Sequence, residues 1–597
     1  MTASGAPRPP TGLLACALVA LALFFAAWPW FGGRSPMLDY TVSGAITFGH
    51  ADATYYAVVG LVELVCVAAL GWTLASRWSA GADARVRELL ASPRAAYAAL
   101  GLLGGLAALA VAIAFVRLHT LTEDEKTYLF QAKLLLSGRL AVPVPPEAGA
   151  FWQPFLVGER VQRWSGQYHW GQPALLALGL LAGVPHVVSA LEVAVTVFFA
   201  GMLGEACTDD RRVGVLGALL VATSPLVVLT GSTLHNANLS AACAMAALWG
   251  LVRLARGPSV AATLALGVGT GLALHGRLQE QATLLLGAGV VLALRERRAL
   301  PALARRLAPA ALLVLPFAAL LPWLAYGVSG SPWRNGYAMF NQGHGWLTFG
   351  FGAGPFGNAH TPAIAGAKTL AALVRVAFYL TGAPLVPLLF AASLALGLEP
   401  RRRLASPAVA VALYGAVYFF YAGTSIHGTG PVYYAALAPV LCVWAAALAV
   451  ALHDRWLAPR AATRRAVPAV VVATLAVSAT VFVPPLLLEL GRASDAASQC
   501  ERLVESRGIT RALVFVRPGT ERGRAWTDWI PMPSPDFDDA VLYANSDSAL
   551  RDAPVARRFG EGRAIYLAQC LRRKEPTLEP YDPFAQAVDA RESGATP

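Results

Sequence analysis

Long apolar runs separated by short polar gaps dominate the first 490 residues of this 597-residue chain. A helix of about 20 apolar residues is long enough to cross the hydrocarbon core of a bilayer. The pattern predicts about thirteen such helices, so the predicted fold class is a polytopic α-helical membrane protein. The predicted spans lie at residues 13–31, 55–76, 97–116, 188–203, 213–230, 239–254, 260–275, 281–294, 307–328, 370–398, 409–421, 432–452 and 467–487. The apolar stretch 173–182 is too short to cross and is predicted to be a partly immersed helix.

The gaps between the runs differ in charge. Arginines fill alternate gaps, at residues 77–94, 211–212, 253–256, 295–306, 401–403 and 455–465. Because arginine-rich loops stay on the cytoplasmic side of a membrane, these gaps and the N-terminus are predicted to be cytoplasmic. The other gaps then face outward, at residues 32–54, 118–172, 231–238, 276–280, 329–368 and 422–431. Nine of the ten histidines lie in or beside outward gaps, which predicts that several line a shared outer cavity.

The composition supports this topology and argues against some partners. Charged residues make up 14% of the chain, against about 25% in soluble proteins, so most of it is predicted to lie in lipid. The net charge of +12 lies in short gaps between spans, which disfavours a nucleic-acid partner. The run 13–31 is too long for the core of a cleavable signal and is interpreted as a retained span. The high content of alanine, glycine and arginine indicates a bacterial gene, and hence the bacterial inner membrane.

After residue 490 the sequence becomes charged and rich in turn residues. Short apolar stretches at 512–516, 540–543 and 564–567 predict the strands of a small α/β domain. We therefore expect an N-terminal hairpin and linker (1–96), a membrane core with the large outer loop 118–172 (97–490), and an extracytoplasmic α/β domain (491–597). The seven cysteines are too scattered for a disulfide framework or a CxxC metal site. Cys500 and Cys570 are the domain's only cysteines; an outside location permits a disulfide, and two buried thiols are the alternative.

The outer loop 118–172 opens on a dense group of charges, Glu123-Asp124-Glu125-Lys126, directly after an apolar run. Charged groups beside a membrane span must stay in water or face a cavity. The residues that follow have the spacing of an amphipathic helix, with Tyr128 on its apolar face, which suits the membrane interface. We interpret this stretch as the mouth of an active site with Asp124 as its reactive group. The alternative is a solvated carboxylate that, like Thr122, caps the helix.

Several short motifs surround this stretch in a recognisable order. After the acidic motif 124–128 come Tyr168-His169-Trp170-Gly171-Gln172-Pro173 at the re-entry to the membrane, Ser224-Pro225, Leu234-His235-Asn236 and His275-Gly276-Arg277. This layout resembles the GT-C superfamily of membrane glycosyltransferases, which includes protein O-mannosyltransferases and lipid A aminoarabinose transferases. The resemblance covers residues 97–306 well and the later spans loosely. The re-entry lacks the double proline usual in these proteins.

The resemblance implies transfer of a sugar from a polyprenyl-phosphate donor to a hydroxyl of a lipid, glycan or protein acceptor on the outer face. Such a donor already carries a good leaving group, so one carboxylate acting as a base suffices, and Asp124 is the candidate. Glu125 would assist it. The cation for the departing phosphate is predicted to be Arg277, with Lys133, Arg160 and Arg163 as further candidates. The other predicted lining residues are Lys126, Tyr128, His169, His235 and His344.

Other interpretations stay open at this stage. Arg277 would equally snorkel to lipid headgroups, and His235 would equally be a polar turn residue. His169 and His235 would bind phosphate or a divalent metal ion, and no cofactor is certain. A lipid or sugar transporter is the rival class, but such proteins place ionisable residues near the midplane and often show internal repeats. The sequence shows neither feature. Composition also leaves room for a structural membrane protein.

Overall fold

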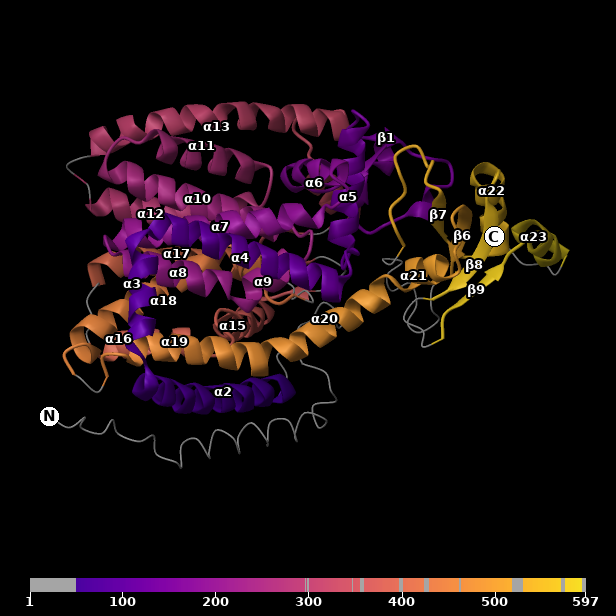
Figure 1. The fold of residues 1–597 in the computed structure, drawn as a ribbon. Helices are drawn as coiled ribbons and strands as arrows, with labels where there is room; N and C mark the ends of the chain where they lie inside the picture. The colour runs from indigo at the N-terminus through magenta and orange to yellow at the C-terminus, as the bar shows by residue number, and fades with distance from the viewer. Residues whose placement is uncertain are drawn as a thin grey trace.

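The chain forms a bundle of long helices with a sheet-containing domain at one end (Figure 1). The computed structural model describes residues 50–295, 297, 300–345, 347–354, 359–396, 401–422, 429–460, 463–517, 530–570 and 575–592. In these residues eight helices are long and apolar enough to cross a membrane, or nine if the bent pair α8–α9 is one span. The predicted polytopic helical membrane protein is confirmed, but the predicted number of about thirteen spans is not. The predicted span 13–31 lies outside the described residues.

Each of the other predicted runs coincides with helical structure. The count is lower partly because some helices are short: α11 has 15 residues and α16 has 11. The helices of the bundle are α2 (His50–Arg77), α3 (Ala80–Ala91), α4 (Pro93–Val111), α7 (His186–Thr208), α8 (Arg211–Ala222), α9 (Pro225–Gly231), α10 (Ala237–Arg256), α11 (Val260–Leu274), α12 (Leu278–Arg295), α13 (Leu300–Ser329), α15 (Pro362–Tyr379), α16 (Leu385–Ala395), α17 (Arg401–Phe420), α18 (Ala438–Leu452), α19 (Ala466–Val477) and α20 (Val483–Ala497).

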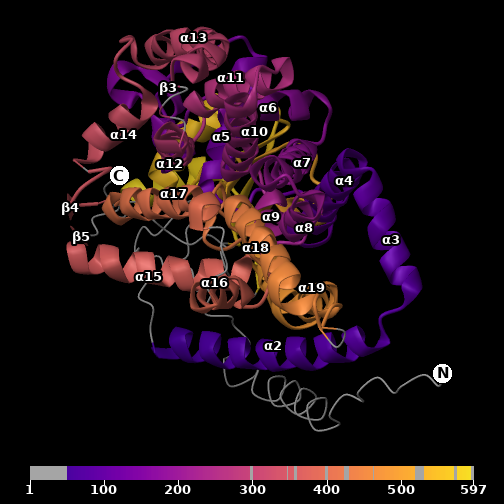
Figure 2. The ribbon, with the colours of Figure 1, turned by 90° about the vertical axis from the view of Figure 1, so that its left-hand side faces the viewer.

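Helix α10 forms the centre of the bundle and α13 its edge (Figure 2). In α10, 89% of the most apolar stretch is buried inside the protein, whereas in α13 only 11% of the corresponding stretch is buried. Small residues allow close packing: Gly101 and Gly105 of α4 lie against α7, where a Cβ atom would come within 2.7 and 2.5 Å of carbonyl oxygens. Close helix approach at small residues is typical of membrane bundles.

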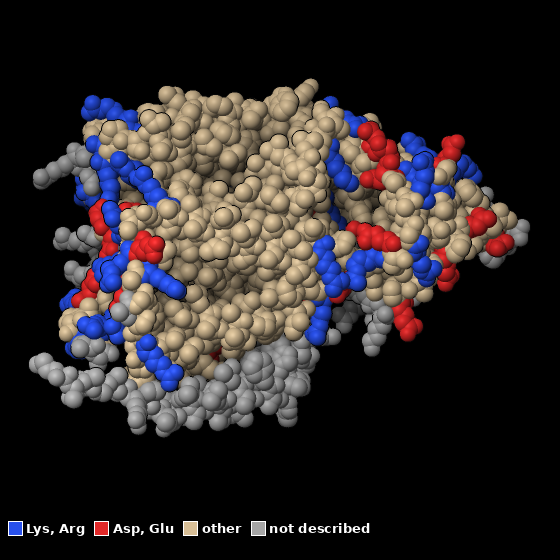
Figure 3. Space-filling model, viewed as in Figure 1, with Lys and Arg blue, Asp and Glu red and all other residues tan. Residues whose placement is uncertain are grey.

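The polar gaps gather at the two ends of the bundle. Ion pairs join arginine-containing gaps that are far apart in sequence: Arg212 binds Asp454, Arg256 binds Asp209 and Arg465 binds Asp83. We call this the arginine-rich end. Figure 3 shows Lys and Arg at this end and again near the domain, with a broad band between them that carries almost no charge. The outer loop 118–172 lies at the opposite end, which we call the domain-side end (Figure 1).

At the domain-side end, the outer loop folds into α5 (Glu123–Leu136), short strands and α6 (Gly171–Leu181). Strand β3 (Arg163–Gly166) pairs with both β1 (Val142–Pro143) and β2 (Leu156–Val157). Nine residues of α5 are buried, including Lys126 and Gln131, because α6 covers one side and the C-terminal domain another. Helix α5 therefore differs from the predicted interfacial helix, which would leave one face in water.

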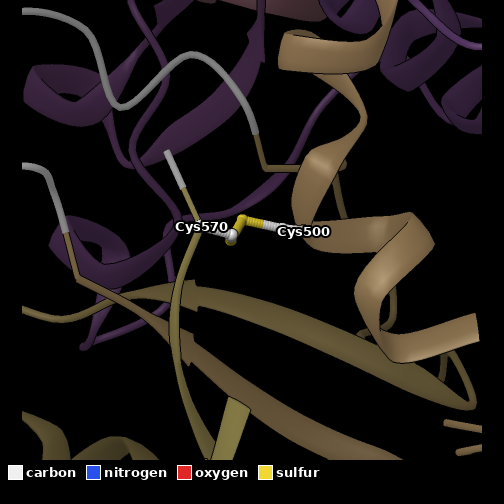
Figure 4. The surroundings of a disulfide bond; sticks show 2 residues. All are labelled: Cys500 and Cys570. Carbon is white, nitrogen blue, oxygen red and sulfur yellow. A yellow bond between two sulfur atoms is a disulfide. The ribbon is translucent and has the colours of Figure 1, made fainter. Parts of the chain in front are cut away.

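The C-terminal domain is a small α/β unit, as predicted. Its sheet has the order β7-β6-β8-β9, with β6, β7 and β8 parallel and β9 antiparallel. Strand β9 was not predicted, because its residues Thr-Leu-Glu-Pro form no apolar run. A disulfide joins Cys500 and Cys570 (Figure 4). The elements are α21 (Gln499–Ser506), β6 (Ala512–Val516), β7 (Val541–Asn545), α22 (Ala549–Phe559), β8 (Ala564–Gln569), β9 (Thr577–Pro580) and α23 (Pro583–Glu592).

Candidate active site

Asp124 lies in the first turn of α5, where the helix dipole favours a negative charge. The hydroxyl of Tyr168 donates a hydrogen bond of 2.5 Å to its Oδ1. The rings of Tyr168 and Tyr128 contact each other at 4.6 Å between centroids. Asp124 is partly exposed, whereas its neighbours Glu123 and Glu125 are buried. Among the described residues, no side chain or backbone group donates to Oδ2, so this oxygen can accept a proton from a ligand.

Glu125 has a different position from Asp124. Its side chain is fully buried, and its Oε2 accepts a hydrogen bond of 2.9 Å from the backbone N–H of Leu121. Thr122 caps α5 by accepting a hydrogen bond from the backbone N–H of Glu125, and the Glu125 side chain in turn holds Leu121, the residue before the cap. Burial raises the pKa of the Glu125 carboxyl to about 8, with a smaller opposing effect from the Leu121 hydrogen bond. This geometry makes Glu125 part of the start of the helix.

Arg277 lies in the connection between α11 and α12 and is 9% exposed. Its Nη1 donates to Glu280 Oε1 at 2.9 Å, and its Nη2 lies 3.4 Å from His235 Nδ1. The carbon of the guanidinium group is 4.7 Å from the ring centroid of Tyr433, which is a cation–π contact. Arg277 is therefore enclosed by protein groups and does not extend towards lipid headgroups.

Asp124 and Arg277 face one group of rings, which we call the tyrosine cluster. Burial raises the pKa of the Tyr433 hydroxyl well above its usual range; the Arg277 charge opposes this rise and the Asp124 charge adds to it. Burial is also the main cause that raises the pKa of the hydroxyls of Tyr128, Tyr337 and Tyr421. In each case the Asp124 charge adds to this rise and the Arg277 charge opposes it. Direct contacts connect the two charges through this region: Asp124 accepts a hydrogen bond from Tyr168, whose ring contacts Tyr128, and Tyr128 meets His235, which lies beside Arg277. The cluster consists of Tyr128, Tyr168, Tyr337, Tyr421 and Tyr433.

Three of the predicted lining residues are histidines. His235 lies beside Arg277 and meets the ring of Tyr128 edge-on at 6.2 Å. The ring of His169 contacts Tyr337 at 5.2 Å, and burial lowers the pKa of His169 to about 4. His169 is therefore neutral near pH 7 and carries no charge for a phosphate. His344 ends α14 (Gly336–His344), and its side chain lies outside the described part of the chain.

Two of the further cation candidates, Lys133 and Arg163, and the predicted lining residue Lys126 have different contacts from Arg277. On α5, Lys126 Nζ donates to the carbonyl of Ile530 and Lys133 Nζ to that of Met532, both at 3.0 Å. These lysines lie on the side of α5 that meets the C-terminal domain. Arg163 Nη1 donates to the carbonyl of Tyr326 at 3.0 Å, at the end of α13. The structure thus brings Asp124, Tyr128, His235 and Arg277 together and leaves these three cations outside the group.

Sequence reasoning missed Glu280, which holds Arg277. Glu280 is fully buried in the first turn of α12. Its spacing of three residues from Arg277 was a usable signal, since residues i and i+3 are neighbours on a helix. Tyr337 comes from α14 and Tyr418 from α17, and no local pattern relates these positions to Asp124. Among the described residues, no group of three or more His, Cys, Asp or Glu side chains is arranged to hold a metal ion.

Comparisons with known proteins find matches among solved structures. No protein-family profile matches the sequence, and no curated protein matches it. Among solved structures, the chain is similar to ArnT, a lipid A aminoarabinose transferase of the GT-C type, from Cupriavidus metallidurans, both bound to undecaprenyl phosphate and in the apo state. The identities are 14% and 13%, the TM-score is 0.48 for both, and the matches cover 78% of this chain and 92% and 90% of the ArnT chains. The roles of individual residues are inferred below from this chain's own geometry.

Proposed function

We propose that this protein transfers a sugar from a polyprenyl-phosphate donor to an acceptor hydroxyl at the outer face of the bacterial inner membrane. One observation carries the proposal: the Asp124 carboxylate and the Arg277 guanidinium group face the same tyrosine cluster at one end of a membrane bundle. Sugar transfer from a lipid phosphate requires a base for the acceptor hydroxyl and a cation for the departing phosphate.

The reaction would proceed as a single displacement. The acceptor hydroxyl gives its proton to Asp124 Oδ2 while its oxygen attacks the anomeric carbon of the sugar. The bond from that carbon to the phosphate oxygen breaks, and the bonding electrons leave with the polyprenyl phosphate. Arg277 stabilises the negative charge that develops on this phosphate, and attack from the opposite side inverts the anomeric configuration. Tyr168 holds Oδ1 of Asp124, so that Oδ2 stays directed at the acceptor.

The environment of these groups favours the reaction. The side chains of Tyr128 and Arg277 are almost fully buried, and Tyr433 covers the guanidinium face. Electrostatic attraction between a fixed cation and a phosphate is much stronger where water is excluded than in bulk solvent. The aromatic faces and hydroxyl groups of the tyrosine cluster suit a sugar, which has both apolar faces and polar edges. We assign the sugar position to this cluster.

Two features support an outer location of the site. The C-terminal domain lies at the same end of the bundle as α5, and it contains the Cys500–Cys570 disulfide (Figures 1 and 4). Disulfides persist in oxidising compartments such as the periplasm. The arginine-rich end lies opposite, as expected for the cytoplasmic side. The proposed orientation therefore has a cytoplasmic N-terminus and an extracytoplasmic domain.

A transporter or flippase of lipid or sugar is the second candidate, and one observation favours it. The expectation that no ionisable residue lies within the spans is wrong: Glu63 in α2, Glu192 in α7 and Arg375 in α15 are buried within helices long enough to cross the membrane. Ionisable residues inside spans often mark transport pathways. A transporter would move its lipid across a vesicle membrane and release no polyprenyl phosphate from a sugar donor.

A transfer assay tests the proposal. The full-length chain in lipid nanodiscs receives polyprenyl-phosphate sugars and candidate acceptors, and the release of polyprenyl phosphate is measured. Asp124→Asn should lower the rate by about 10²- to 10⁴-fold, the usual contribution of a catalytic base. The matched control is Asp454→Asn, a carboxylate at the arginine-rich end that should not affect the rate. A rate near the parent's in Asp124→Asn would overturn the assignment of the base.

A further inference from the structure

The side chain of Glu280 has an unusually complete set of hydrogen bonds for a carboxylate in this bundle. It is fully buried, and its two oxygens accept three hydrogen bonds from three separate parts of the chain. Arg277 Nη1 donates to Oε1 at 2.9 Å, Tyr418 Oη donates to Oε1 at 2.6 Å, and Ser240 Oγ donates to Oε2 at 2.6 Å. The donors come from the α11–α12 connection, from α17 and from α10.

This network determines how Arg277 can lie. The bond to Glu280 fixes one edge of the guanidinium group, and Tyr433 lies against its face at 4.7 Å. The second terminal nitrogen, Nη2, is directed towards His235 at 3.4 Å. A planar guanidinium group held along one edge and one face keeps its remaining N–H groups in a fixed direction. In this chain that direction is the side of His235 and Tyr128.

We propose that Glu280 is a positioning residue, which holds Arg277 so that its free N–H groups receive the phosphate of the lipid donor. This inference rests on the proposed function. Glu280 touches neither donor nor acceptor and acts through Arg277. A carboxylate near a phosphate would by charge alone weaken phosphate binding. The two possible effects of Glu280, positioning and repulsion, therefore have opposite signs and can be separated by experiment.

The test is a binding measurement that needs no knowledge of the sugar or the acceptor. The full-length chain in nanodiscs is titrated with a long-chain polyprenyl monophosphate and, separately, with the uncharged polyprenol of the same length. The variants are Arg277→Ala, Glu280→Gln and the double variant. Arg277→Ala should weaken phosphate binding by about 10- to 100-fold, the range of a hydrogen bond to a charged group. Glu280→Gln should weaken it in the same direction, by about 3- to 30-fold.

The double variant decides whether Glu280 acts through Arg277. If it does, the double variant binds the polyprenyl phosphate as weakly as Arg277→Ala alone, because effects that share one interaction do not add. Additive losses would overturn the proposal. Phosphate binding by Glu280→Gln that equals or exceeds the parent's would also overturn it, since the carboxylate would then act by repulsion or not at all.

Further measurements separate positioning from damage to the fold. Polyprenol affinity should be unchanged in every variant that keeps the lipid site. Asp552→Asn is the matched control: it changes another buried, hydrogen-bonded carboxyl, in the C-terminal domain, and should leave phosphate binding unchanged. If Glu280→Gln fails to fold, Tyr418→Phe removes one hydrogen-bond donor and keeps both charges. It should weaken phosphate binding about 2- to 5-fold in the parent, less than the loss of a whole hydrogen bond to a charged group, because Glu280 keeps its bond to Arg277. It should have no effect in Arg277→Ala. Equal binding in the parent background would contradict the proposal.

The outcomes also distinguish this inference from the proposed function. If the parent chain binds the polyprenyl monophosphate no more tightly than polyprenol, the lipid-phosphate donor itself is wrong. If the parent prefers the phosphate and Arg277→Ala loses that preference while Glu280→Gln keeps it, the proposed function stands and the positioning role of Glu280 is wrong.

Discussion

The two ends of the helix bundle carry charge in different ways. At the arginine-rich end, Arg212 pairs with Asp454 and Arg256 with Asp209, and these four side chains are 40–70% exposed. At the domain-side end, the side chains of Arg277 and Glu280 are 10% and 0% exposed. The domain-side end also has exposed pairs, such as Arg117 with Asp495, but among the described residues a pair with both side chains withdrawn from water occurs only at this end.

The difference in burial between the ion pairs indicates that they have different roles. Exposed ion pairs contribute about 0–1 kcal/mol, and their charges are sufficiently explained by membrane orientation. Burying a charge costs several kcal/mol, and a buried pair often stabilises a protein less than apolar residues of the same size. Stability alone thus explains the buried pair at the domain-side end poorly, and the pair is consistent with the role in ligand binding that we propose.

After Asp124→Asn, the largest effect is expected from matched arginine variants at the two ends. Arg277→Ala should lower sugar transfer by about 10²- to 10³-fold, because it removes the cation that stabilises the departing phosphate. Arg212→Ala removes an exposed arginine and should change the transfer rate by less than about 2-fold, in keeping with a surface pair. The measurement is the release of polyprenyl phosphate by purified variants in nanodiscs. Equal losses in both variants would show that the two ends do not differ in function.

A smaller effect concerns stability and pH. Burial raises the pKa of Glu125 to about 8 in the folded chain, from an ordinary value of 4.5. Between these pH values the folded chain keeps a proton that the unfolded chain has lost, so the free energy of unfolding falls as the pH rises from about 5 to about 8. Glu125→Gln cannot titrate and should reduce this fall.

The measurement is the thermal unfolding midpoint of the purified protein at pH 5, 6, 7 and 8, compared between parent and Glu125→Gln. Asp454→Asn is the control, since this carboxylate is 48% exposed at the arginine-rich end and should leave the pH profile unchanged. A parent and a Glu125→Gln variant with identical pH profiles would mean that Glu125 is ionised in the folded chain.

Much of the fold could be predicted from sequence because lipid imposes a simple pattern. Apolar runs mark the helices, and the arginine gaps do meet at one end, as Arg212 and Asp454 show. The number of spans could not be predicted, because length and hydropathy do not show that α8 and α9 bend by 52°. Strand β9 and the outer strands β1, β2 and β3 are too short and polar to give an alternating signal.

Of the candidate site, the sequence indicated only the charged residues. Asp124 and Arg277 were selected as candidates because a charge at the border of an apolar run is unusual and therefore informative. The same reasoning selected Lys133 and Arg163, whose contacts with Met532 and Tyr326 depend on tertiary packing. The network around Glu280 likewise depends on how α10, α12 and α17 meet, which no local pattern records.

The position of a bound polyprenyl monophosphate tests the central claim most directly. A structure of the full-length chain in nanodiscs with this lipid would locate the phosphate. The account predicts the phosphate within hydrogen-bonding distance of the Arg277 guanidinium group, on the side of the tyrosine cluster that Asp124 faces. A phosphate held elsewhere, with Arg277 still in contact with Glu280, His235 and Tyr433 alone, would contradict it.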